Sequence, residues 1–405
     1  MRVLIASLGG PHVACIVPLS WACQLAGHEV RVAVRPQGVE LVTAAGLTAV
    51  PVGDEDAIMR AQQPFAGLTH GNSPRDLPQD WVRRPELVPT ESRLNMANRL
   101  FAAAAVVSND LVAFAREWRP NVIVHDTANH AGLVAASAID VPAIGHTWGY
   151  SIGFNYREDP DLWRGYSQLF DRAGVDPIDE RVWIDPCLPS IRDRHRIPTA
   201  PMRVVPYNGP VVAPTWLARS SDRPRVCITG GLTTDLLDDL VVRVAKGLQQ
   251  LGAEIVITLG DLERVDTQAL ASLTAGVQVL ENFPLSVLTR TCDLVVHHGG
   301  VGTMLNTAAY GVPQVVLPQS AMQDWVGTKI QNAGAGLMVD VSGTVEPDTV
   351  GQVVNTVLTE PRFREQAVRL QQDNAAAPAP EKLVGLLEHC AAGGDPLASP
   401  LVSLA

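Results

Sequence analysis

Histidines and closely spaced glycines stand directly after stretches predicted to be buried strands. The run His297-His298-Gly299-Gly300-Val301-Gly302-Thr303 separates an apolar strand pattern, residues 293–296, from a helical pattern, residues 303–310. A strand, a glycine-rich turn and a helix together direct backbone N–H groups and the positive end of the helix dipole at an anion. Glycine allows close backbone approach, Thr303 can cap the helix or offer its hydroxyl, and an imidazole can donate a hydrogen bond. The pattern predicts a diphosphate site, and a tight turn with two surface histidines is the alternative.

A histidine and a carboxylate follow two predicted strands of the first half. His12 ends the first strand–helix turn, residues 7–12, and Asp126 follows the strand predicted over 121–125. Histidine titrates near neutral pH and is suited to accept a proton from a hydroxyl. A carboxylate can hold that imidazole in one tautomer and stabilise its protonated form. We predict an acid–base pair, with a polar loop residue and a helix N-cap as the alternatives for His12 and Asp126.

Aromatic side chains gather in two segments of the first half. The stretch 53–92 has weak periodicity and contains Phe65 and Trp81, and a loop this long in a compact domain is usually functional or mobile. Further rings follow the strand predicted over 141–145: Trp148, Tyr150, Phe154, Tyr156 and Trp163. Such rings can stack on a flat polycyclic ligand, and packing of a helical insertion explains them equally well.

Strand and helix patterns alternate in both halves of the chain, which is typical of parallel sheets covered by helices on both faces. Two doubly wound domains bring the carboxyl ends of their strands to a shared cleft. We predict an N-terminal domain over 1–208, a linker over 209–222 and a C-terminal domain over 223–375. A helix over 376–391 is expected to pack back on the N-terminal domain, and residues 392–405 are expected to form a flexible tail.

Composition excludes several classes of function. The chain has 405 residues, of which 46% are hydrophobic and 18% charged, so two globular cores are available. A formal charge of −11 argues against nucleic-acid and anionic-membrane partners. The six cysteines lack metal-like spacing, which favours buried thiols in a reducing cytoplasm. No apolar run reaches the ~18 residues of a membrane span, and no signal peptide is recognised.

The glycine-rich motif resembles the donor-binding signature of GT-B, family 1 glycosyltransferases of the bacterial natural-product type. The resemblance covers nearly the whole chain and includes residues 18–30 near the start. Residues 184–192 and 202–210 resemble deoxysugar transferases of macrolide, anthracycline and other polyketide pathways. This resemblance implies an α/β GT-B fold, in which two Rossmann-like domains face an interdomain cleft. The N-terminal domain then binds the acceptor and the C-terminal domain binds a nucleotide sugar.

The resemblance assigns roles to the residues already singled out. His12 matches the general base, with Asp126 as its partner. His298 matches the imidazole that contacts a donor phosphate, together with Gly300, Gly302 and Thr303, while His297 is the structural neighbour.

Other donor positions depart from the family pattern. Thr229 and Gly231 match a second loop that faces the diphosphate, although Gly230 replaces the leucine of the usual Thr-Leu-Gly pattern. The aromatic residue that usually contacts the base, two places before a proline, corresponds here to Asn282, with Phe283 beside it. Because neighbouring strand residues face opposite sides of a sheet, only one of the two can contact the base.

The position that usually carries a sugar-binding carboxylate is Met322, followed by Gln323. A thioether accepts no strong hydrogen bond and offers an apolar surface, so the pattern predicts a donor sugar short of hydroxyls, such as a 2,6-dideoxyhexose. Asp324 can substitute only if the loop shifts. By resemblance the stretch 53–92 lies over the acceptor site, and the predicted acceptor residues are Phe65 and Trp81 in that stretch with Trp148 and Tyr150 after it.

The implied activity is inverting, metal-independent transfer of a deoxysugar from a nucleoside diphosphate, expected to be dTDP, to a polyketide or similar aglycone in antibiotic biosynthesis. No cofactor is expected, because the nucleotide sugar is a co-substrate. A cytochrome P450-like auxiliary protein, which relatives of this subgroup often require, and a homodimer are the protein partners to test. The alternatives are a nucleotide-sugar epimerase on the same fold and a non-catalytic helper protein. An NADP reductase is disfavoured because residues 8–11 lack the G-x-G-x-x-G spacing.

Overall fold

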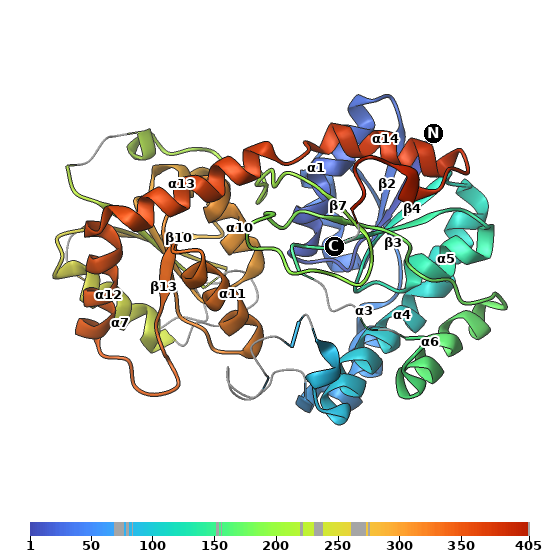
Figure 1. Cartoon of the computed structure of the whole chain (residues 1–405), viewed down its shortest axis with the longest axis horizontal. Coiled ribbons are helices and arrows are strands. Elements are labelled where there is room, and N and C mark those ends of the chain that lie inside the picture. Colours follow the sequence, from blue (N-terminus) through green and yellow to red (C-terminus); the bar gives the residue numbers. More distant parts are fainter. Residues whose placement is uncertain are drawn as a thin grey trace.

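Two parallel sheets, one in each half of the chain, form the frame of the molecule (Figure 1). The computed structural model describes residues 1–68, 77, 81–82, 84–150, 154, 156–218, 222–230, 238–260, 273 and 276–403. For residues 66–68, 85, 238 and 239 it describes the backbone alone.

The N-terminal sheet has the strand order β3-β2-β1-β4-β5-β6-β7, and all its strands are parallel. Its strands are β1 (Arg2–Ala6), β2 (Glu29–Val34), β3 (Thr48–Pro51), β4 (Val122–Asp126), β5 (Ala143–His146), β6 (Trp183–Asp185) and β7 (Thr199–Pro201). Its helices are α1 (His12–Leu25), α2 (Val39–Ala44), α3 (Glu55–Gln62), α4 (Thr90–Trp118), α5 (Ala131–Ile139) and α6 (Pro160–Ala173).

The central strands β1 and β4 are rich in apolar residues because both faces of this sheet are covered, and their polar residues, Arg2, His125 and Asp126, stand at the strand ends. Side chains alternate between the faces, so Val3 and Ile5 of β1 pack in the core with α1, whereas Leu4 and Ala6 pack in the core with α4 and α5. The parallel pairing of β1 with β4 places the carboxyl ends of these strands side by side, with Ala6 opposite His125.

The C-terminal sheet repeats this design with the order β10-β9-β8-β11-β12-β13, again all parallel. Its strands are β8 (Arg225–Thr229), β9 (Glu254–Leu259), β10 (Val277–Glu281), β11 (Leu294–His297), β12 (Gln314–Val316) and β13 (Gly336–Met338). Its helices are α7 (Asp238–Gln249), α9 (Leu285–Leu288), α10 (Val301–Ala309), α11 (Ala321–Asn332), α12 (Pro347–Thr359) and α13 (Pro361–Ala376).

The chain crosses between the domains twice. Residues 202–214 run from β7 to the C-terminal domain without helix or strand, and a 3-10 turn, Thr215–Ala218, precedes β8. After α13, the last helix α14 (Pro380–Ala391) returns to the N-terminal domain, and the two helices run along one side of the molecule in Figure 1. Leu383 and Leu387 of α14 enter the core that contains Leu19 of α1.

The segment after Ala391 differs from the flexible tail expected from its composition. Ser403 pairs with Thr199 of β7 through two backbone hydrogen bonds, of 2.9 and 3.0 Å, and Asp395 forms an ion pair with Arg181 at 3.0 Å. The edge strand β7 leaves backbone groups without a strand partner, and the end of the chain satisfies some of them. Composition alone carried no sign of this pairing.

The cysteines form no disulfide bonds in the structure. All six cysteines are free thiols, and all but Cys15 are buried. Across the part of the chain that the structure describes, none of the helices is both long enough and apolar enough to cross a bilayer.

Candidate active site

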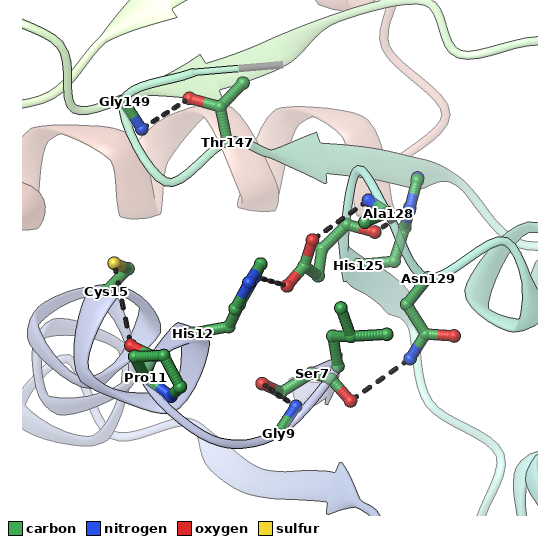
Figure 2. A network of polar contacts seen from close by, with 12 residues as sticks. Ser7, Gly9, Pro11, His12, Cys15, His125, Ala128, Asn129, Thr147 and Gly149 are labelled. Carbon is green, nitrogen blue, oxygen red and sulfur yellow. Dashed lines mark hydrogen bonds and ion pairs between the residues drawn. The ribbon is translucent and has the colours of Figure 1, made fainter. Parts of the chain in front are cut away.

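The turn between β1 and α1 carries His12 to the edge of the N-terminal sheet. Gly9 and Gly10 adopt positive φ angles of 96° and 56°, a conformation that favours glycine, and His12 is the first residue of α1. The backbone N–H of Gly9 donates to Ser7 Oγ at 3.2 Å, and Asn129 Nδ2 donates to the Ser7 carbonyl at 3.2 Å (Figure 2). These bonds fix the His12 turn to the loop that follows β4.

His12 and Asp126 are in direct contact. His12 Nδ1 lies 2.6 Å from Asp126 Oδ2, and the other carboxylate oxygen accepts the backbone N–H of Ala128 at 2.9 Å (Figure 2). Burial alone raises the pKa of Asp126, but the neighbouring His12 and the hydrogen bonds outweigh it and lower that pKa below its ordinary value. An ionised carboxylate only accepts hydrogen bonds, so Nδ1 of His12 must carry the hydrogen. Nε2 of a neutral His12 is then left free to accept a proton.

The helix-cap alternative for Asp126 does not describe its position. Helix α5 begins at Ala131, its N-cap is His130, and the Asp126 bond to Ala128 closes a turn ahead of that helix. His125 and His130 are buried, and they are hydrogen-bonded to the Asp126 carbonyl and to the Tyr156 hydroxyl respectively.

The glycine-rich turn of the other domain leads into α10. Its N-cap is Gly300, so Thr303 is the third residue of the helix and does not cap it as the sequence suggested. Met304 N donates to the Gly300 carbonyl at 2.9 Å, the first bond of the helical ladder. The N–H groups of Val301, Gly302 and Thr303 therefore lack partners within the helix and point out of its positive end.

Tight packing explains two of the glycines in this turn. A Cβ on Gly299, which has a φ of 95°, would lie 2.8 Å from the backbone oxygen of Gln323, and one on Gly300 would lie 2.7 Å from Nε2 of His298. A Cβ on Gly302 meets nothing within 4 Å. Gly299 thus lets α11 approach the turn, and Gly300 makes room for the imidazole of His298.

His298 is buried and electrically neutral. Burial lowers its pKa to about 4, against a smaller opposing effect of a hydrogen bond with the backbone of Thr229. A neutral imidazole can still donate one hydrogen bond to a phosphate oxygen. His297 points elsewhere, since its Nε2 contacts Gln314 Oε1 at 2.9 Å, and its burial lowers its pKa to about 3.

One cavity joins the two domains and contains both histidines. Its volume is about 400 Å³, within the range of small-molecule sites. His12 lies on its N-terminal wall, and His298 and the start of α10 lie on its C-terminal wall. Several other residues singled out in the sequence line the same cavity: Trp148, Gly300, Gly302, Thr303, Met322 and Gln323. The shared crevice that the sequence interpretation requires is therefore present.

Four donor positions lie away from this cavity wall or outside the described residues. Thr229 is buried at the end of β8 behind His298. Gly231 lies outside the described residues. The strand argument for Asn282 and Phe283 is wrong, because β10 ends at Glu281 and Asn282 has a positive φ of 48°. Asn282 is exposed, and Phe283 packs against the C-terminal core.

The predicted acceptor aromatics separate into two groups. Trp148 lines the cavity and lies against the His12 ring, with centroids 4.4 Å apart. Trp81 and Tyr150 are buried in a cluster with Trp325 of α11, so they pack between the domains and do not line this cavity. Phe65 is half-buried outside the cavity wall, and its carbonyl accepts a hydrogen bond from Asn95.

Two asparagines on the cavity wall, Asn208 and Asn306, were not predicted from the sequence. Asn208 Oδ1 accepts hydrogen bonds from Ser286 N at 2.9 Å and from Asn306 Nδ2 at 2.8 Å, so it ties the interdomain crossing to α9 and α10. Asn306 lies one turn after Thr303 on α10, a spacing that could have indicated it. Asn208 carried no comparable signal.

Two doubly wound domains that close on one cavity, with a His–Asp pair on one wall and a glycine-rich helix N-terminus on the other, define a GT-B glycosyltransferase. The chain belongs to the erythromycin biosynthesis protein CIII-like family. The model of its N-terminal domain matches residues 21–231, and the model of its C-terminal domain matches residues 242–390.

Individual relatives match over almost their whole length. The chain is 34% identical to the 3-alpha-mycarosylerythronolide B desosaminyl transferase of Saccharopolyspora erythraea, covering 97% of this chain and 99% of that protein. It is 34% identical to the TDP-daunosamine transferase DnrS of Streptomyces peucetius, covering 97% of each. The solved structure of the glycosyltransferase VinC in complex with dTDP matches with a TM-score of 0.81 and 28% identity, over 97% of this chain and 100% of that one. The protein is thus a GT-B glycosyltransferase of the antibiotic-biosynthesis type.

Proposed function

We propose that the protein transfers a deoxysugar from a thymidine diphosphate donor to a hydroxyl group of a polyketide-type aglycone, with inversion at the anomeric carbon. The observation that carries this proposal is the placement of His12 and the start of α10 on opposite walls of one cavity. The names of the relatives support the substrate classes, since they describe desosaminyl and daunosamine transferases.

The proposed reaction is a single displacement. Nε2 of His12 takes the proton of the acceptor hydroxyl, and the acceptor oxygen forms a bond to the anomeric carbon. The bond from that carbon to the diphosphate breaks, and the diphosphate leaves with the electron pair. One displacement from the face opposite the leaving group inverts the configuration. Asp126 stabilises the imidazolium that forms.

The departing diphosphate gains negative charge, which the start of α10 is built to receive. The N–H groups of Val301, Gly302 and Thr303 and the positive helix end stabilise that charge without moving. The ring of His298 adds one hydrogen bond to a phosphate oxygen. We assign the removal of the acceptor proton to His12.

The cavity wall supports a hydrophobic acceptor and a deoxygenated sugar. Apolar side chains from the N-terminal domain and the crossing segment line it: Pro18, Leu41, Trp148, Met202, Val204 and Tyr207. Met322 and Gln323 line it at the start of α11, where a thioether favours a sugar lacking a hydroxyl.

The decisive experiment combines the purified protein, a thymidine diphosphate 2,6-dideoxysugar and a polyketide aglycone, with product followed by mass spectrometry. The anomeric configuration of the product, read by NMR, tests inversion, and a chelator tests independence from metal. The His12→Ala variant is expected to lose transfer yet bind thymidine diphosphate normally in calorimetry. Turnover by that variant close to the wild-type rate would reject the role of His12.

The same assay separates the other proposals. Donor incubated without acceptor reveals an epimerase if an epimerised nucleotide sugar appears. A wild-type chain that binds donor but transfers no sugar even when a P450-like auxiliary protein is supplied would support a helper protein. Full activity of the purified chain would remove the need for a P450-like auxiliary protein, and light scattering of the same sample tests the homodimer.

A further inference from the structure

A continuous row of rings crosses from the His12 wall of the cavity to α11 of the other domain. The centroids of His12 and Trp148 lie 4.4 Å apart, those of Trp148 and Tyr150 5.8 Å, and those of Tyr150 and Trp325 5.5 Å. Tyr150 and Trp325 are buried. Trp148 and Tyr150 belong to the N-terminal domain and Trp325 to α11, so the row spans the domain boundary.

A buried carboxylate anchors the far end of this row. Asp193, in the loop after β6, accepts the indole N–H of Trp325 on Oδ2 at 2.8 Å. Its other oxygen forms an ion pair with Lys329 Nζ. Trp325 and Lys329 lie four residues apart, on one face of α11, and the ammonium group lies 5.4 Å from the Trp325 ring centroid. One carboxylate of the N-terminal domain therefore holds two side chains of the same helix.

The held helix carries part of the cavity wall. Met322 and Gln323 stand in the first turn of α11 and line the cavity, and Met322 is three residues from Trp325. The backbone of Gln323 also packs directly on Gly299, next to His298. A displacement of α11 relative to His12 would therefore move the sugar-facing wall, while the contact with Gly299 keeps α11 and the diphosphate turn together within the C-terminal domain.

We propose that Asp193 is a positioning residue: its contacts with Trp325 and Lys329 form a clasp that sets the distance between Met322 on the donor wall and His12 on the acceptor wall. This inference rests on the proposed function, since it concerns how the two substrates are aligned. The clasp touches neither substrate. It acts because Asp193 and Trp325 are buried and paired with each other, so they have no equally good second arrangement.

The clasp predicts a division between binding and transfer. The diphosphate contacts lie on α10 and its preceding turn, within the C-terminal domain, and do not depend on the distance between the domains. Alignment of the acceptor with the anomeric carbon does depend on it. Misplacement of reacting groups by about 1 Å can lower a rate about 100-fold, whereas nucleotide affinity should stay almost unchanged.

The test uses two variants of the clasp and one matched control. Asp193→Ala removes both contacts, and Trp325→Phe removes the indole N–H but keeps an aromatic ring. Asp373→Ala is the control, because it removes another hydrogen bond across the domain boundary, the one that Asp373 on α13 receives from Ser190 N at 2.8 Å.

We expect Asp193→Ala to lower kcat for transfer about 10- to 100-fold while the Kd for thymidine diphosphate changes by less than about twofold. The fraction of donor lost to hydrolysis should rise, since a looser cavity admits water. The selectivity for 2-deoxy over 2-hydroxy donor sugars should fall, because Met322 is no longer held in place. Trp325→Phe should shift the same quantities in the same direction, and the double variant should be no worse than Asp193→Ala.

Three results would overturn the clasp. Wild-type transfer and hydrolysis in Asp193→Ala would show that the contacts position nothing. An equal loss of nucleotide affinity and transfer would show general damage to the fold. A comparable effect of Asp373→Ala would show that any contact between the domains matters equally.

A measurement without catalysis separates this inference from the proposed function. The difference in acrylamide quenching between wild type and Trp325→Phe reports the shielding of Trp325, and Asp193→Ala should reduce that shielding. A wild-type protein that transfers no sugar, with or without a P450-like auxiliary protein, would reject the proposed function while leaving this readout intact. Unchanged shielding in Asp193→Ala would reject the clasp whatever the activity.

Discussion

The geometry around Asp126 makes replacement by asparagine more damaging than replacement by alanine. One carboxylate oxygen of Asp126 accepts the Ala128 N–H, and the other contacts His12 Nδ1. An asparagine that keeps its oxygen toward Ala128 must present its NH₂ group to His12. The reverse orientation would set two donors against each other at Ala128. His12 Nδ1 then becomes the acceptor, so the proton moves to Nε2, the atom that must accept the acceptor proton.

The expected loss can be worked from two contributions. Unit charges about 4 Å apart at an effective dielectric constant of about 20 attract by about 4 kcal/mol, which corresponds to about 1,000-fold in rate. The side chain of His12 is 20% exposed, and water therefore screens part of this attraction. We expect about 10- to 100-fold loss of kcat from the missing charge in Asp126→Ala. The wrong tautomer in Asp126→Asn should bring the loss to about 1,000-fold or more.

The assay is steady-state transfer at saturating donor for wild type and both variants. Thymidine diphosphate affinity and thermal unfolding serve as controls, because Asp126 contacts neither α10 nor the C-terminal sheet. An Asp126→Asn enzyme as active as Asp126→Ala, or within about tenfold of wild type, would refute the tautomer argument. It would also remove the main support for His12 as the base.

Three further predictions concern other parts of the molecule. Gly300→Ala places a Cβ against the His298 ring and should weaken thymidine diphosphate binding about 10- to 100-fold in calorimetry, the value of a hydrogen bond to a charged group; unchanged affinity would exclude His298 from the diphosphate site. Met322→Asp should raise kcat/KM for a 2-hydroxylated donor relative to a 2-deoxy donor by at least about tenfold, measured by competition between the two sugars; an unchanged ratio would place the sugar elsewhere. Burial is the main cause that raises the pKa of Glu180 to about 8. Between the ordinary carboxyl pKa and about pH 8, the folded protein therefore keeps a proton on Glu180 that the unfolded chain has released. The stability that this group contributes at acidic pH is lost as the pH rises to about 8. The Tm of wild type relative to Glu180→Gln should therefore fall between pH 5 and pH 8 in calorimetry, and parallel curves would contradict that shift.

Much of the frame was predictable because buried parallel strands leave a strong local signal. The patterns over residues 29–34, 225–229 and 254–259 coincide with β2, β8 and β9. The strands β6, β7 and β13 were missed because three residues are too few to show a period. The turn at Asn282 was taken for strand because a single positive φ angle has no signature when the residue is not glycine.

The contact between His12 and Asp126 was predictable across 114 residues for a topological reason. Each residue follows a strand, and the carboxyl ends of parallel strands reach the same sheet edge, so adjacency of β1 and β4 brings the two side chains together. The start of α10 was predictable in the same way. The predicted start of α10, at Thr303, lies two residues after its observed start at Val301. In the sequence, Val301 and Gly302 fit the end of a glycine-rich turn as well as the first residues of a helix.

No local sequence pattern identifies the residues that hold the two domains together. Asp193 lies in a loop without periodicity, and its partners Trp325 and Lys329 are more than 130 positions away, on a helix of the other domain. Local patterns specify each wall of the cavity separately, because each wall is built on its own sheet. The distance between the walls depends on pairs of side chains that meet only after both domains have folded. Catalysis by alignment needs that distance as much as it needs His12, so we expect substitutions of Asp193 and Trp325 to change transfer more than they change nucleotide binding.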